Sequence, residues 1–100
     1  ADLDRATSLA PDEPAGWLLS AALARRQQDF PRARAAIARA AARAPADPDI
    51  RFEQGAVRAA EGALPGARTL WEQLVKAAPG TPAAELAARA LAASGEPLSR

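Results

Sequence analysis

Hydrophobic positions recur along this 100-residue chain at intervals of 34 residues. Three apolar columns follow this spacing: Leu3, Ile37 and Trp71; Leu18, Phe52 and Leu86; and Leu23, Val57 and Leu91. Prolines keep the same interval, with one series at Pro11, Pro45 and Pro79 and another at Pro14, Pro48 and Pro82. Because apolar residues and prolines recur with the same spacing, the chain contains an internal repeat of 34 residues.

Each repeat predicts two helices, because a helix-start signal occurs twice per period. Glu13, Asp47 and Thr81 each precede a proline, which puts a capping-type residue ahead of a proline in the first turn. The second helix of each repeat begins near Pro31 or Pro65. The predicted helices cover residues 2–9, 14–27, 31–43, 48–61, 65–77 and 82–94. Two-helix units of this length, joined by short turns, stack into a solenoid.

Composition strengthens the helical prediction. Hydrophobic residues make up 49% of the chain, and 30 of them are alanines, the best helix former. Lys and Arg number 13 against 12 Asp and Glu, so the net charge of +1 creates no overall field that would attract nucleic acid or anionic lipid. The chain has no Cys, His, Met or Tyr, which excludes thiol nucleophiles, His-based proton relays and Cys/His metal sites.

The repeat resembles the tetratricopeptide repeat (TPR), whose pattern is W-x2-L-G-x2-Y, then A-x3-F, then P. Positions that match this pattern are Trp17, Ala21, Ala33, Ile37 and Pro45 in the first unit and Gly55, Ala67, Trp71 and Pro79 in the second. In such a pattern, Ala21, Gly55, Ala33 and Ala67 stand where the two helices of a pair approach closely. Larger side chains there would push the helices apart.

The sequence departs from the family pattern at several positions. Arg51 replaces the first aromatic residue of the second unit, and Ala24 and Arg58 replace the tyrosines. Gln28 stands where a turn glycine is usual. The resemblance nevertheless extends over nearly the whole chain.

The resemblance implies an all-α fold: a right-handed superhelical array of antiparallel helix pairs with about six helices. Its register predicts the tail helix of a preceding repeat at 1–10, TPR units at 14–45 and 48–79, a C-terminal capping helix at 82–94 and a flexible tail at 95–100. Arg89 takes the small-residue position that Ala21 and Gly55 hold in the units. We therefore expect the helix over 82–94 to face solvent as a cap.

The resemblance also implies that function lies on a concave surface formed by the first helix of each unit. The positions expected to line this groove are Leu18, Ala22, Arg25, Arg26, Asp49, Phe52, Ala56 and Leu86. Leu18, Phe52 and Leu86 form an apolar line, and Arg25 and Arg26 stand at one edge. Such a surface suits an apolar or amphipathic helix with an acidic flank. The expected function is therefore a non-catalytic protein–protein interaction module.

Two alternatives for this function stay open at the level of sequence. The groove can instead be filled by the chain itself or by a second copy, which would make the protein a structural scaffold. The motifs Gly16-Trp17-x-Leu19 and Trp71-Glu72-x-Leu74 also resemble those in TPR domains of bacterial cytochrome c maturation factors.

The tryptophans and a basic stripe have structural interpretations. Trp17 and Trp71 fall in columns that pack helix against helix, so we expect them in the core. Arg32, Arg39 and Arg43 share one face of their helix, but the stripe does not continue into the second unit. We therefore interpret it as a solvated helix face.

The sequence contains no recognisable catalytic or cofactor site. Its acidic pairs stand at helix starts, where capping explains them, and its serines have no His to activate them. We expect no catalytic residues, no metal and no cofactor. The expected partner is another protein or peptide segment, a second copy of the chain included. We expect no binding of nucleic acid or of a small-molecule substrate, and no membrane-spanning segment. The Ala/Arg/Pro bias indicates a GC-rich bacterial genome, with cytoplasm and periplasm both open.

Overall fold

The computed structural model describes residues 13–95, which form five helices and no strand. The helices are α2 (Pro14–Arg26), α3 (Phe30–Arg43), α4 (Pro48–Ala60), α5 (Leu64–Ala77) and α6 (Pro82–Gly95). Each begins and ends within one residue of its predicted range, which confirms the all-α prediction. The predicted helix over 2–9 and the predicted tail beyond Gly95 lie outside the described residues.

The helix starts show why the boundaries were predictable. In α2 to α5 a proline occupies the first or second helical position, where its missing N–H costs nothing. Asp47 caps α4 by accepting the amide hydrogen of Asp49 at 2.9 Å. Thr81 Oγ1 likewise accepts from the Ala84 N–H at 3.2 Å. The capping prediction is wrong only for Glu13, whose side chain makes no cap hydrogen bond.

The two turns between paired helices have the same hydrogen-bond pattern. The Asp29 N–H donates to the Ala24 carbonyl at 2.8 Å, and one repeat later the Ala63 N–H donates to the Arg58 carbonyl at 2.8 Å. In this motif the residue before the donor takes a left-handed conformation. Gly62 has φ +91°, while its counterpart Gln28 is forced to φ +63° despite its side chain. The departure at Gln28 is thus one of residue type, and the turn is unchanged.

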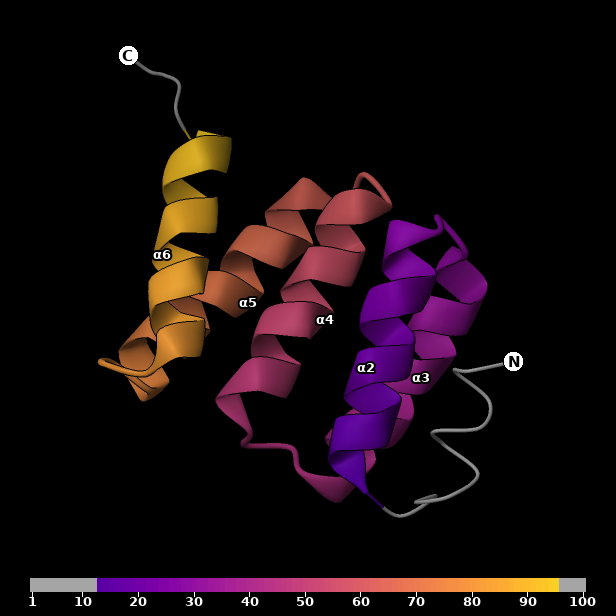
Figure 1. The fold of residues 1–100 in the computed structure, drawn as a ribbon. Coiled ribbons are helices and arrows are strands. Elements are labelled where there is room, and N and C mark those ends of the chain that lie inside the picture. Colours follow the sequence, from indigo (N-terminus) through magenta and orange to yellow (C-terminus); the bar gives the residue numbers. More distant parts are fainter. Residues whose placement is uncertain (1–12, 96–100) are drawn as a thin grey trace.

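The helices form two layers (Figure 1). α2 and α3 form one hairpin, and α4 and α5 form the next. The first helices of successive pairs, α2, α4 and α6, lie side by side in one layer, and α3 and α5 cover them from behind. We call the surface of α2, α4 and α6 that faces away from α3 and α5 the inner face. The opposite surface is the outer face.

Small residues make the helix contacts. Ala21, Ala33 and Ala67 are fully buried, which confirms the close approach predicted for them. Larger core side chains are few, and Ile50, Val57 and Leu74 are the largest that are fully buried. Because alanine leaves little volume to fill, the helices sit close together and tolerate little added bulk.

Candidate protein-binding surface

The inner layer carries the positions that the sequence predicted for a groove. Leu18 and Ala22 lie on α2, Phe52 and Ala56 on α4, and all four are half-buried. Leu86 on α6 is 47% exposed, one of the two most exposed large hydrophobic side chains in the described range. The charged members Arg26 and Asp49 are exposed. The positions predicted for the groove therefore all lie on the helices of the inner layer, and most of them are small or apolar.

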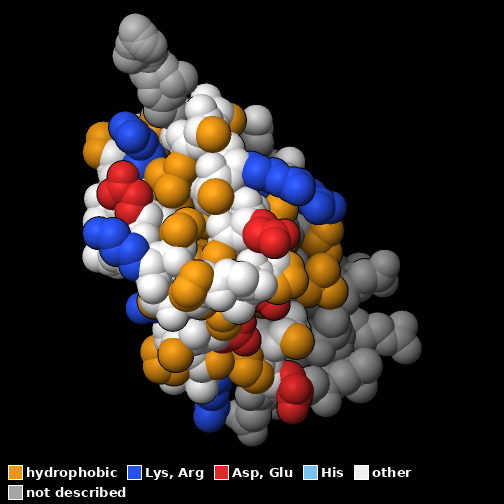
Figure 2. All heavy atoms as spheres, turned by 90° about the vertical axis from the view of Figure 1, so that its left-hand side faces the viewer, with side chains coloured by type: hydrophobic (Ala, Val, Ile, Leu, Met, Phe, Trp, Pro, Cys, Tyr) orange, Lys and Arg blue, Asp and Glu red, His pale blue; other side chains and the backbone are white. Residues whose placement is uncertain are grey.

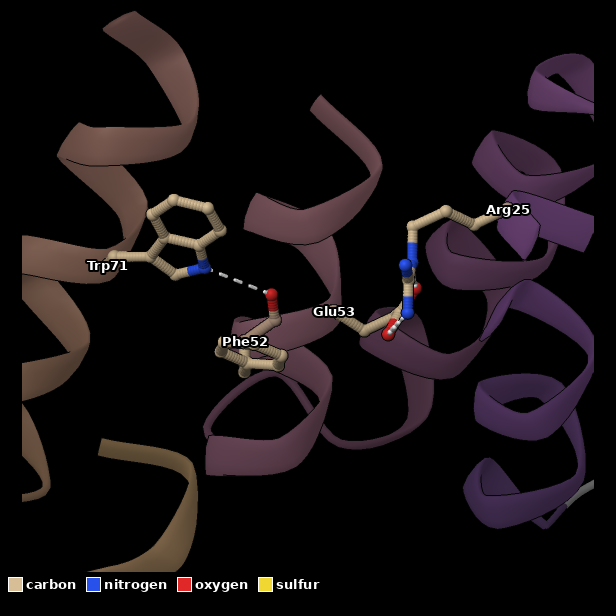
Figure 3. A network of polar contacts seen from close by, with 4 residues as sticks. All are labelled: Arg25, Phe52, Glu53 and Trp71. Atoms are coloured by element: carbon tan, nitrogen blue, oxygen red, sulfur yellow. Dashed lines mark hydrogen bonds and ion pairs between the residues drawn. The ribbon is translucent and has the colours of Figure 1, made fainter. Parts of the chain in front are cut away.

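Phe52 packs against the core, although the sequence placed it in the groove. Its ring stacks on Trp71 of α5, with 5.9 Å between ring centroids and an interplanar angle of 23°. The Trp71 indole N–H donates to the Phe52 backbone carbonyl at 3.2 Å (Figure 3). Trp71 itself is 5% exposed, so its predicted place in the core is confirmed. Phe52 therefore leaves only part of its ring accessible to a ligand.

Arg25 is already occupied by a partner within the chain. Its Nε donates to Glu53 Oε2 at 2.6 Å and its Nη2 donates to Oε1 at 3.4 Å, a two-point ion pair between α2 and α4 (Figure 3). Glu53 is 5% exposed, so its carboxylate depends on Arg25 for compensation. The sequence predicted that Arg25 is available to an acidic ligand, whereas in the structure Arg25 is paired with Glu53. Arg26 has no ion pair among the described residues and keeps its charge for a ligand.

Sequence reasoning missed this ion pair, although a signal was present. Glu53 occupies the column of Leu19 and Ala87, where its repeat counterparts are apolar. A lone carboxylate in an apolar column requires a cation nearby, because burying an unpaired charge is costly. Figure 3 shows the result on α4, where the consecutive residues Phe52 and Glu53 reach in opposite directions, one toward α5 and the other toward α2.

The basic stripe on α3 is more than a solvated face. Arg39 is exposed, but its guanidinium carbon lies 4.9 Å from the ring centroid of Trp17 on α2, within cation–π distance. Arg32 forms an ion pair with Asp29 at 3.8 Å. Trp17 is half-buried and packs against the core around Ile37 and Ile50, which confirms its packing role.

The described residues carry few groups suited to chemistry. No three side chains from His, Cys, Asp and Glu in residues 13–95 gather where they could hold a metal ion. No helix in that range is both long enough and apolar enough to cross a bilayer.

Comparison with protein families identifies the repeat. A model of the tetratricopeptide repeat matches residues 1–48 and, in a second overlapping match, residues 18–82. The matches include α2 to α5 and reach the first residue of α6. Searches of curated proteins and of solved structures find no significant match to the chain.

Proposed function

Because the chain belongs to the tetratricopeptide repeat family, whose members are generally protein–protein interaction modules, we propose that its inner face binds an apolar or amphipathic segment of another protein. The proposed site consists of Leu18, Ala22, Arg26, Asp49, Phe52, Ala56 and Leu86, with Arg25 as a supporting residue. Binding there requires no chemistry and no cofactor, in keeping with the non-catalytic character typical of the family.

The observation that carries this proposal is the exposure of Leu86 at the end of an apolar line. A leucine that is 47% exposed gains about 1 kcal/mol or more when a partner covers it. Leu18 and Phe52 continue the line across α2 and α4, and the alanines between them let a partner backbone approach closely. The exposed charges of Arg26 and Asp49 stand at its margins and favour a partner with matching polar residues on its flanks.

The experiment compares two variants of equal chemistry and nearly equal exposure. Leu86→Glu places a charge on the inner face. Leu19→Glu places the same charge on a leucine that is 50% exposed and outside the apolar line. Phe52 is not suitable for this test, because a charge there would break the stack on Trp71 and damage the core.

Capture of proteins from a cell extract, identified by mass spectrometry, is the measurement. We expect a protein that wild type and Leu19→Glu capture and Leu86→Glu loses. Equal capture by all three proteins would contradict the inner-face site. Equal loss of capture in both variants would indicate that the wild-type protein binds through nonspecific hydrophobic contacts.

Self-association is a second candidate function, and the surface at the α6 end favours it. Figure 2 shows this end of the molecule, where hydrophobic side chains are exposed in patches with charged side chains beside them. A second copy seated there would cover them. Light scattering over a range of concentrations tests this candidate, since a constant monomer mass would exclude it.

A further inference from the structure

A cavity of about 360 Å³ opens on the outer face, between α3 and α5, with α4 as its floor. Arg58 and Val57 of α4 line it, together with Ile37 of α3 and Leu70 of α5. Arg58 follows Ala56 by two positions, which turns it about 200° around the helix from the inner face. The cavity is therefore a separate surface from the proposed inner-face site.

The floor and one wall of this cavity are apolar, while Gln54 and the charged residues of the rim supply its polar lining. Val57 is 2% exposed and Ile37 is 7% exposed, so both belong to the rigid core and form a fixed floor. Leu70 is half-buried and forms the α5 wall. The volume lies at the lower end of the range for ligand pockets, about 300–1,000 Å³, and suits one large apolar side chain or two small ones.

The charges at the rim are unequal. Arg34 of α3 forms an ion pair with Glu61 at the end of α4, so these two charges offset each other. Arg58 is exposed and forms no ion pair with any described residue. Its side chain runs past Gly66, where a Cβ atom would lie 3.5 Å from Arg58 Cδ and 3.7 Å from Nη1. Among the described residues that line the cavity, Arg58 thus carries the one positive charge without an ion-pair partner, and it lies beside the apolar floor.

We propose that this outer cavity binds a short segment of a partner protein in which an apolar side chain stands beside a carboxylate. The apolar side chain packs against Leu70, Ala38 and Ala63, above the buried floor. The carboxylate pairs with Arg58. A charge-assisted Arg–carboxylate contact supplies orientation, while the apolar contact supplies most of the affinity. This binding goes beyond the proposed inner-face function and is compatible with two partners bound at once.

The test uses fluorescently labelled eight-residue peptides of Gly and Ser that carry one Leu and one Glu at separations of one to four positions. Each has a twin in which Gln replaces Glu. Fluorescence anisotropy measures their binding to the whole chain. We expect at least one separation to bind, with its Gln twin about tenfold weaker. Arg58→Gln should abolish the difference between the twins. Arg68→Gln removes the same charge from an exposed position outside the cavity and should preserve it.

Three results would overturn the proposal. One is the absence of binding by every peptide at a Kd below about 1 mM. Another is an equal effect of Arg58→Gln and Arg68→Gln, which would indicate nonspecific attraction to positive charge. The third is loss of peptide binding in Leu86→Glu, which would place the peptide on the inner face and support that site instead. Circular dichroism of each variant verifies that it is folded.

Discussion

Gly55 of α4 lies directly against the indole of Trp71. A Cβ atom on Gly55 would be 2.7 Å from Trp71 Cδ1 and closer still to Nε1, well inside van der Waals contact. The indole is buried and is held by its stack on Phe52 and its hydrogen bond to the Phe52 carbonyl. It therefore has little freedom to move away.

We predict that Gly55→Ala destabilises the protein by about 1–3 kcal/mol through overpacking, although alanine is the better helix former. Urea unfolding followed by circular dichroism measures the change. Gly66→Ala is the matched control, because the new Cβ would meet Arg58 at an ordinary distance of 3.5 Å. There the helix propensity of alanine dominates and we expect unchanged or slightly higher stability. Equal effects at both glycines would contradict the packing argument.

A second prediction concerns the left-handed turn residue Gln28. Its φ of +63° is costly for a residue with a Cβ atom, and Gly62 occupies the same place one repeat later at φ +91°. Gln28→Gly should therefore raise the free energy of unfolding by about 1 kcal/mol. The reverse change, Gly62→Gln, should lower it by a similar amount, since no atom lies within 4 Å of the added Cβ and backbone strain acts alone. A loss of stability in Gln28→Gly would show that the glutamine side chain contributes more than the strain costs.

The ion pair between Arg25 and Glu53 predicts an asymmetry. The Glu53 side chain is 7% exposed, whereas that of Arg25 is 27% exposed. Arg25→Met leaves a buried carboxylate without a counter-charge and should cost about 3 kcal/mol. Glu53→Gln keeps an acceptor oxygen and leaves an arginine that can still reach water, so about 1 kcal/mol is expected. Thermal or urea unfolding measures the loss in the free energy of unfolding for both variants. Similar losses would mean that the pair acts through packing alone.

The cap of α6 depends on Thr81. Its hydroxyl donates to the Ala78 carbonyl at 2.8 Å and accepts from the Ala84 N–H at 3.2 Å. Thr81→Ala should cost about 1 kcal/mol and increase amide hydrogen exchange in the first turn of α6. Thr69→Ala removes the same hydroxyl from an exposed site within α5, where it donates to the Pro65 carbonyl four residues back. We expect a change of less than about 0.5 kcal/mol there.

Most of the fold was predictable from local signals. Each helix starts at a proline or one residue before it, and a repeat period aligns the starts with one another. The proposed groove positions come from the register of the family pattern and stay a prediction. Burial could not be derived in this way, because it depends on how neighbouring helices tilt. Phe52 illustrates the difference, since its register places it in a groove while its ring packs on Trp71.

Side-chain contacts between helices were the part that sequence reasoning could not supply. Arg25 and Glu53 are 28 residues apart and belong to different units, so no helical spacing relates them. Arg39 over Trp17 joins helices α2 and α3 across a turn in the same nonlocal way. The outer cavity also escaped prediction, because it exists only where α3, α4 and α5 meet.

Because of the Arg25–Glu53 pair, the two units cannot exchange places in the chain without loss of an interaction. One repeat later, the equivalent positions are Ala59 and Ala87, and Ala59 packs against the apolar cluster that contains Ala87. At these positions the contact between α2 and α4 is an ion pair, whereas the equivalent contact between α4 and α6 is made by alanines. A tandem duplication of the second unit would set the second copy's Glu53 beside the first copy's Ala59, which leaves the carboxylate without a counter-charge. The second unit therefore requires a preceding unit with a cation at the position of Arg25, although all units share one fold.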